Sequence, residues 1–316
     1  MSAAPATSHG GYGPREVGLL LTTSLVWGAA YVFIRQGLVL GAAPLAFASV
    51  RYLLSAVAFA VLAAVRKETF PARRDLLVSA SIGGVLIIGL YGGFLYWGEQ
   101  FTTGGYAAVL ASTAPLLTVA IGFSLLAAER LGKQGLVGMG IGFVGATILV
   151  VPELAGINPL GSWEGPPFIL AAIVCTAFGT VLLRRFGHGR QGLWQIGAQF
   201  TVAGTMLGIA SLAIPGAHAL PVTVGVLELL GILVAFSSTV GYFSYFALHH
   251  LVGPVRANIV AYLAPLVGVG VGTGLYGEPI TVWEIAGVTV VLVGVSLILL
   301  ESARRAAAAY PPRSAA

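Results

Sequence analysis

Polar and aromatic side chains recur at helical spacing in the apolar segment 222–247. Ser238, Tyr242 and Tyr245 continue to His249 in steps of three or four residues, which places the four side chains on one face of a helix. Hydroxyl groups inside so apolar a segment need polar partners, because lipid offers none. Two interpretations fit the pattern equally well. This face lines a cavity that binds a solute, or it forms a seam of hydrogen bonds between helices.

Similar side chains lie in other apolar segments. Trp27 and Tyr31 are one helical turn apart, as are Asn258 and Tyr262. Aromatic walls suit flat apolar groups, and nearby hydroxyl and amide groups suit the polar end of an amphipathic solute. The candidate substrate-binding residues are therefore Trp27, Tyr31, Tyr91, Trp97, Ser112, Trp163, Ser238, Tyr242, Asn258 and Tyr262. Two of these, Trp97 and Trp163 at segment ends, also fit an interfacial belt of aromatic residues.

Charged residues are scarce within the apolar segments. Arg51 lies seven residues into the segment 44–65, or about 10 Å along a helix. Its long side chain is expected to reach the outer interface. The alternative is that the guanidinium binds a substrate carboxylate. Glu99 falls in a predicted outer loop, and Glu278 is expected to cap the N-terminus of the helix that follows it. No Asp or Glu stands at the centre of a predicted span, so the sequence shows no obvious carrier for a coupling proton.

The sequence contains none of the short motifs that would indicate an enzyme. A nucleoside-triphosphate loop, an H-E-x-x-H pair and paired aspartates in facing segments are all missing. Cys175 is the single cysteine, which excludes an intrachain disulfide and a cysteine metal cluster. We expect a protein that is not an enzyme and that has no catalytic residue, metal or other cofactor. An intramembrane enzyme and a channel are the weaker alternatives.

The composition indicates the environment of these side chains. Of the 316 residues, 57% are hydrophobic and 9% are charged, whereas a soluble domain has about a quarter of its residues charged. A spanning helix needs about 20 mostly apolar residues, so we expect an all-α polytopic membrane protein. Turn and charge signals predict ten transmembrane helices near 17–39, 44–65, 76–98, 103–127, 134–152, 166–186, 192–214, 222–247, 255–276 and 281–301.

Basic residues predict the orientation of these helices. With both termini in the cytoplasm, most basic residues fall on the inner side, chiefly at 66–74, 130–133, 184–190 and 304–313. Arg35 falls on the outer side. Basic loops remain in the cytoplasm as a rule, so residues 1–16 and 304–316 are predicted to be cytoplasmic tails.

Two stretches that lie 150 residues apart are alike. Ala111, Pro115, Val119 and Gly122 recur as Ala261, Pro265, Val269 and Gly272. The halves 17–155 and 156–303 then contain five spans each and lie in opposite directions. Such an inverted repeat is typical of secondary transporters, whose substrate site lies where the halves meet. Pro115 and Pro265 are expected to bend their helices and to act as kinks or gates.

The opening and closing motifs of the two halves resemble those of a known superfamily. WGAAYVFIR at 27–35 and FGTVLLRR at 178–185 open the halves with an aromatic-glycine pair. A-x-x-A-P-L at 111–116 and 261–266, followed by a glutamate and a glycine-rich helix, closes them. Over about residues 17–301 the chain thereby resembles the EamA-type exporters of the drug/metabolite transporter (DMT) superfamily. The stretch YWGEQFTTGGYAAVLASTAPL at 96–116 is most similar to YddG-type exporters of aromatic amino acids.

The resemblance implies an exporter in the cell inner membrane, with a central cavity lined by spans one, three, four, six, eight and nine. The implied solute is an amino acid with an aromatic or large apolar side chain. The alternative is a drug or another metabolite handled by the same superfamily. The expected partners are this small molecule and the lipid bilayer, with no nucleic acid, and the protein is expected to act as a monomer.

Overall fold

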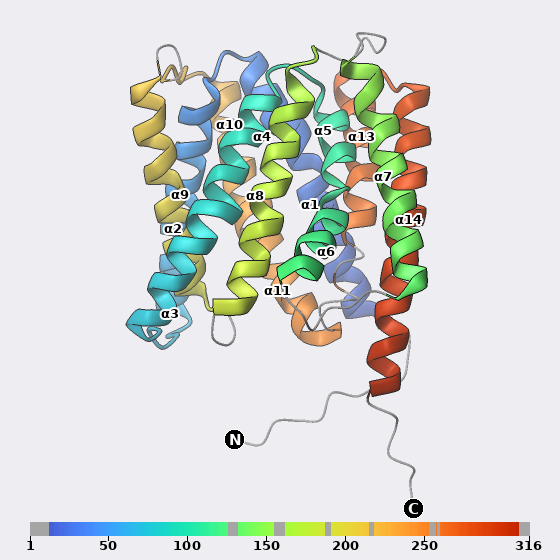
Figure 1. Cartoon of the computed structure of the whole chain (residues 1–316). Helices are drawn as coiled ribbons and strands as arrows, with labels where there is room; N and C mark the ends of the chain where they lie inside the picture. The colour runs from blue at the N-terminus through green and yellow to red at the C-terminus, as the bar shows by residue number, and fades with distance from the viewer. Residues whose placement is uncertain are drawn as a thin grey trace, which may run out of the picture.

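The described part of the chain consists of helices and the turns that connect them, with no strand. The computed structural model describes residues 13–125, 132–154, 162–186, 191–214, 218–252, 257 and 260–309. Six helices among these residues are long and apolar enough to cross a membrane, and three shorter helices are also apolar. The expectation of an all-α polytopic membrane protein therefore agrees with the architecture, in which long helices run side by side (Figure 1).

Fifteen elements follow one another along these residues, and the labels match Figure 1. They are α1 (Pro14–Val39), α2 (Pro44–Val65), α3 (Arg73–Val78), η1 (Ser79–Leu90), α4 (Tyr91–Gly98), α5 (Gly104–Ala111), α6 (Ala114–Leu125), α7 (Lys133–Leu154), α8 (Gly165–Phe186), α9 (Leu193–Ala213), α10 (Val224–Ile232), η2 (Leu233–Val240), α11 (Gly241–Val252), α13 (Val260–Tyr276) and α14 (Val282–Ala309). The first two helices begin with a proline, whose missing N–H has no partner at a helix start in any case.

Two helices contain a widened π-helical segment at matching positions. η1 links α3 to α4, and η2 links α10 to α11. η1 ends at Leu90 and η2 at Val240, so the two ends differ by 150 residues, which is the offset between the repeated motifs. Because π-helical turns are rare and concentrate at functional sites, the residues around these segments are candidates for a functional site.

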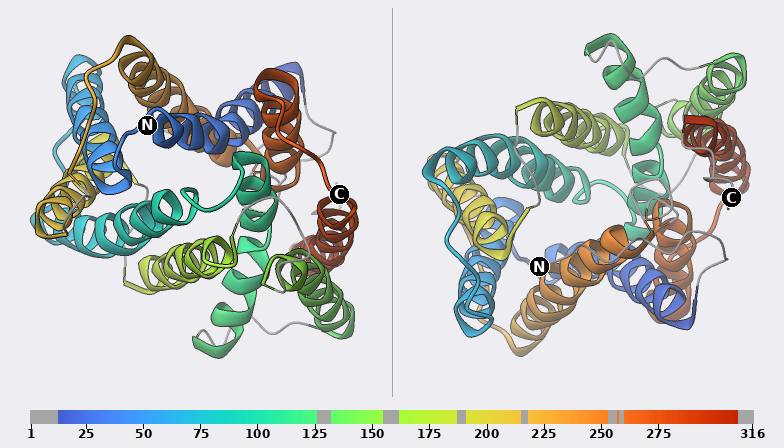
Figure 2. Two further views of the ribbon diagram at one scale, coloured as in Figure 1. Left: turned by 90° about the horizontal axis from the view of Figure 1, so that it is seen from above. Right: turned by 90° about the horizontal axis from the view of Figure 1, so that it is seen from below.

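Two helix pairs form opposite sides of the bundle. α7 packs along α14 on one side, and α2 packs along α9 on the other (Figure 2). A Cβ at Gly294 would lie 2.5 Å from the Gly142 nitrogen and 2.6 Å from the Gly138 oxygen, so α7 and α14 touch backbone to backbone. In the second pair, Ser49 Oγ donates to the Gly204 carbonyl at 2.8 Å. Small residues permit both contacts, as is usual between membrane helices.

The helices that carry the matched prolines differ from each other. Pro265 lies inside α13, whereas Pro115 is the second residue of α6, after an interruption that separates α6 from α5. At this interruption Ser112 Oγ donates to the Val109 carbonyl at 2.6 Å, and Thr113 Oγ1 donates to the Leu110 carbonyl at 2.8 Å. Hydroxyl groups thus bind carbonyls next to the break.

Carboxylates cap helix N-termini, but not always on the helix that follows. Glu278 accepts hydrogen bonds from the nitrogens of Gly104 and Gly105 at 3.1 and 2.8 Å, and so caps α5. The expected cap on the following helix is therefore wrong. At the start of α14, the Thr281 nitrogen donates to Glu284 and the Glu284 nitrogen donates to Thr281 Oγ1, a local capping box.

Candidate functional site

The Arg51 guanidinium lies inside the bundle. Arg51 belongs to α2, and its side chain is 6% exposed. Nη1 donates to the Tyr96 hydroxyl at 2.8 Å, Nη2 to Ser237 Oγ at 2.8 Å and Nε to Ser238 Oγ at 3.3 Å. The side chain therefore ties α2 to α4 and η2. The expectation that it reaches the outer interface is wrong, because neighbouring helices supply its partners within the protein.

The positive charge of Arg51 is not neutralised by its hydrogen-bond partners. All three are uncharged hydroxyl groups, and within the described residues Arg51 forms no ion pair with a carboxylate. A buried charge without a counter-charge is unfavourable, and in a membrane protein it usually marks a binding site or ion pathway. A guanidinium has five N–H donors, so three bonds leave two for another acceptor. The arrangement can bind an anion.

Aromatic rings pack around this guanidinium. The Tyr52 ring centroid lies 5.5 Å from Arg51 Cζ and 5.6 Å from the centroid of the Phe200 ring of α9. The Tyr96 ring lies 6.3 Å from the Tyr52 ring. A Cβ at Gly92 would lie 2.2 Å from the Tyr52 hydroxyl, so the approach of α4 to α2 requires glycine at this position. The wall beside the charge is thus aromatic.

The structure brings several predicted site residues to the same place. Tyr31 and Tyr91 share a hydrogen bond between their hydroxyls at 3.0 Å. Ser238 binds Arg51, and the charge of Arg51 acts on the phenols of Tyr31 and Tyr242. We call Tyr31, Arg51, Tyr91, Ser238 and Tyr242 the central cluster. Its members come from α1, α2, α4, η2 and α11.

Trp27 closes the central cluster on the side of α1. Its ring lies 5.5 Å from the Tyr242 ring and 4.9 Å from the Tyr245 ring, and its Nε1 donates to the Ser237 carbonyl at 3.1 Å. A Cβ at Gly241 would lie 2.4 Å from Trp27 Nε1, so glycine lets the indole lie directly on α11. The face predicted in segment 222–247 therefore makes contacts with α1 and α2.

The remaining predicted site residues lie elsewhere. Trp97 packs against Phe168 of α8, with ring centroids 6.4 Å apart. Trp163 lies in the turn before α8 and is 61% exposed. The Ser112 hydroxyl is occupied at the interruption between α5 and α6. Asn258 lies outside the described residues, and so does the side chain of Tyr262.

Sequence reasoning missed three residues of this site. The signal for Arg51 is its depth in an apolar segment, since charged residues inside spans usually have a functional role. Tyr96 stands at the end of a predicted span, where tyrosines commonly form the interfacial belt, yet its side chain is fully buried. Ser237 lies one position before Ser238 of the predicted face, and in the wider turn of η2 its hydroxyl also accepts a hydrogen bond from Arg51.

A cavity of about 510 Å³ lies at the end of the bundle where α2 ends and α9 begins. Arg66, Glu68 and Phe243 are among its lining residues, together with Phe59 and Phe246. The rings of Phe59 and Phe246 each lie 6.4 Å from the Tyr242 ring. The cavity therefore approaches the central cluster from this end, and its volume is in the range of small-molecule sites, about 300–1,000 Å³.

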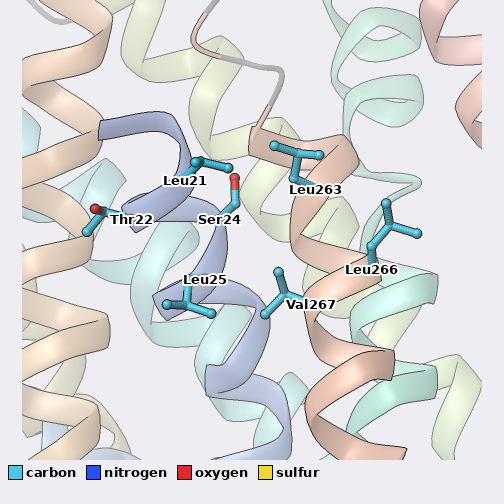
Figure 3. A pocket seen from close by; sticks show the side chains of 7 residues that line it. All are labelled: Leu21, Thr22, Ser24, Leu25, Leu263, Leu266 and Val267. Atoms are coloured by element: carbon cyan, nitrogen blue, oxygen red, sulfur yellow. The ribbon is translucent and has the colours of Figure 1, made fainter. Parts of the chain in front are cut away.

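Another cavity, of about 450 Å³, lies between α1 and α13 (Figure 3). Leucine and valine side chains dominate its walls, and Leu21, Leu25 and Leu266 are each 55% exposed. None of the predicted site residues lines it. It belongs to the outer surface of the bundle, where apolar side chains face lipid.

The sequence matches the EamA-like transporter family twice, over residues 15–151 and 163–300. Relatives of similar length exist in bacteria. The chain is 33% identical over 286 residues to YedA of Escherichia coli (strain K12), named an uncharacterized inner membrane transporter, with 90% of each chain covered. It is 26% identical over 289 residues to a probable amino-acid metabolite efflux pump of Salmonella typhimurium, covering 87% of this chain and 92% of the relative.

A solved crystal structure has a similar fold. It superposes with a TM-score of 0.62 and covers 93% of this chain and 99% of its own, at 16% sequence identity. At that identity the likeness concerns the arrangement of the helices.

Proposed function

The chain belongs to the EamA-like transporter family, and on this premise we propose that it exports amino acids with aromatic or large apolar side chains across the inner membrane by alternating access. The relative from Escherichia coli is named an inner membrane transporter, which supports the location. The relative from Salmonella typhimurium is named an amino-acid metabolite efflux pump, which supports the direction and the substrate class. The aromatic preference is that of the YddG-type exporters, which residues 96–116 resemble.

Arg51 is the observation that carries this proposal. A buried guanidinium whose partners are neutral hydroxyls can accept a carboxylate from the solute, as a charge-assisted hydrogen bond or a bidentate pair. The rings of Tyr31, Tyr91 and Tyr242 lie in the same cluster and would hold the apolar part of the solute. A carboxylate beside an aromatic group is the chemical description of an aromatic amino acid.

The other predicted residues complete the proposed site. Ser238 of η2, together with Asn258 and Tyr262, would bind the polar end of the solute. Trp27 would form a wall beside Tyr242. Trp97, Ser112 and Trp163 would act along the path of the solute, and Pro115 and Pro265 would permit the helices that carry them to change their bend.

We propose ten membrane crossings in two inverted repeats, 17–155 and 156–303, with the tails 1–16 and 304–316 in the cytoplasm. The two separate matches to the family support two repeats. The 150-residue offset between the ends of η1 and η2 supports their equivalence. α7 pairs with α14, and α2 with α9, as equivalent helices do across a two-fold axis.

Transport by purified protein in liposomes tests the proposal. Labelled L-phenylalanine and phenethylamine share the same ring, but only the amino acid has a carboxylate. The wild-type protein is expected to move the amino acid, and Arg51→Gln is expected to raise its apparent KM by roughly 10- to 100-fold, since a hydrogen bond to a charged group contributes about 1.5–3 kcal/mol.

The matched control is Arg185→Gln, which removes an exposed guanidinium that lies over the Phe186 ring. This variant is expected to transport like the wild type. If the wild type moves organic cations but no amino acid, the alternative function, export of drugs or other metabolites, is favoured. An equal loss of transport in Arg51→Gln and Arg185→Gln would contradict a specific role of Arg51.

A further inference from the structure

Glu99 has a fully buried carboxylate. The residue follows the end of α4 and is 0% exposed. Neither carboxylate oxygen has a hydrogen-bond partner among the described residues, and the buried hydroxyl of nearby Thr102 has none either. The sequence predicts an outer loop for Glu99, but the packing of Gly98 against Ile169 and Gly165 of α8 buries this loop. An ionised carboxylate without donors is unfavourable in such a place.

The neighbouring charges do not pair with this carboxylate. Arg35 of α1 directs its Nη1 to the backbone carbonyls of Glu99 and Gln100, at 2.8 and 2.9 Å. Glu278, which follows α13, is engaged with the start of α5. From α2, Arg51 is bound by hydroxyl groups.

The turn before α8 contributes one more charged group, Glu164, which accepts a hydrogen bond from Ser162 at 3.3 Å. Among the described residues, the phenols of Tyr31, Tyr52 and Tyr96 also interact electrostatically with Glu99.

The balance of these groups favours a neutral carboxyl. Burial raises the pKa of Glu99 well above its ordinary value, and the negative charge of Glu278 raises this pKa further. Arg35 and Arg51 act in the opposite direction and are the weaker influences. Burial without donors therefore favours the side chain as a carboxylic acid while this end of the bundle is packed around it.

We propose that Glu99 is a proton-binding site that holds this end of the transporter closed. The closed end encloses the neutral acid. Opening would hydrate the side chain, which would then lose its proton to water as the carboxylate forms. Closure controlled by Glu99 would regulate the transport proposed above, and in that respect this inference rests on the proposed function.

The direction of the pH dependence follows from this balance. Between the ordinary pKa of a hydrated glutamate and the raised pKa of buried Glu99, the closed form holds a proton that the open form has released. A rise in pH through this window therefore favours the open form, and a fall in pH favours the closed form. In Glu99→Gln, the amide resembles the neutral acid in shape, so this end should remain closed at every pH in the window.

Infrared spectra of the purified protein test proton binding without any solute. The wild type at neutral pH is expected to show the carbonyl band of a protonated carboxyl that Glu99→Gln lacks. The control Glu164→Gln, which removes a carboxylate with a hydroxyl partner at the same end, should retain the band. A difference spectrum without this band would overturn the proposal. Failure of Glu99→Gln to fold would also contradict it, because a site built for the neutral acid should accept an amide.

A buried cysteine tests the closure. Thr102→Cys in a Cys175→Ser background places a thiol at a buried position three residues after Glu99, and maleimide can reach it only when this end opens. Dividing the labelling rate by the rate in the same protein with Glu99→Gln removes the pH dependence of the thiol itself. This ratio is expected to rise by about tenfold per pH unit while Glu99 is mostly protonated. A ratio that does not change with pH would contradict the proposal that protonated Glu99 holds this end closed. Since neither measurement needs a solute, a protein that binds the proton but moves no amino acid would contradict only the transport proposal.

Discussion

At the scale of single residues, the hydrogen bond between Tyr31 and Tyr91 offers a test of the central cluster. The two hydroxyls lie 3.0 Å apart and join α1 to α4. Tyr31→Phe removes one hydroxyl and leaves the ring in place. We expect the unfolding free energy to fall by about 0.5–1.5 kcal/mol, the usual net value of one hydrogen bond, and the apparent KM for L-phenylalanine to rise.

The double variant Tyr31→Phe with Tyr91→Phe shows whether the two hydroxyls act together. If they act as a pair, the effects on thermal stability in detergent will be less than additive. Reduced stability with an unchanged KM in Tyr31→Phe, Tyr91→Phe and the double variant would make this pair part of the scaffold and remove it from the binding site.

At the scale of helices, the contact between α7 and α14 depends on glycine. A Cβ at Gly294 would meet backbone atoms of Gly142 and Gly138 at 2.5 and 2.6 Å, and backbone cannot move aside as a flexible side chain does. Gly294→Ala is expected to lower stability by about 1–3 kcal/mol through overpacking. Gly140→Ala on the same pair of helices is the control, because its Cβ would meet nothing within 4 Å. Thermal unfolding in detergent compares the two, and equal stability would contradict the close contact.

A second prediction at this scale concerns the cap that joins the two halves of the chain. Glu278 binds the first two backbone nitrogens of α5, 174 and 173 residues away in the sequence. Glu278→Ala is expected to lower the unfolding free energy by about 0.5–2 kcal/mol, the range of other helix caps. Glu164→Ala removes a carboxylate bonded to a serine hydroxyl and should cost less. If both variants unfold at the same temperature, the carboxylate of Glu278 does not stabilise α5.

At the scale of the whole molecule, the proposed topology predicts which loops face the outside. Single cysteines are introduced at Ser162, just before α8, and at Ala72, just before α3, in a Cys175→Ser background. These two helices begin at opposite ends of the bundle (Figure 1). In intact cells an impermeant maleimide is expected to label position 162 and to leave position 72 unlabelled until the membrane is broken. The reverse pattern would contradict the cytoplasmic termini and the placement of Glu99 at the outer end.

Composition and periodicity by themselves determined the class of the molecule and several candidate residues. Apolar segments of spanning length require helices in lipid, and the repeated A-x-x-A-P-L predicts two related halves. The spacing of Ser238 and Tyr242 placed both on one helical face, and both lie in the central cluster. Each of these inferences needs only neighbours along the chain, because hydrophobicity and helical period are local properties.

Tertiary structure decided what the charged residues do. The Arg51 side chain was expected to reach the outer interface and Glu99 to lie in an outer loop, yet each is buried, because helices distant in sequence pack around them. Likewise, Glu278 caps α5 and not the helix that follows it. Whether a charge is hydrated, paired or enclosed depends on which helices lie beside it, and helical periodicity carries no information about that choice. The pairing of α7 with α14 and of α2 with α9 also had to come from the fold, since glycine permits a close contact without specifying its partner.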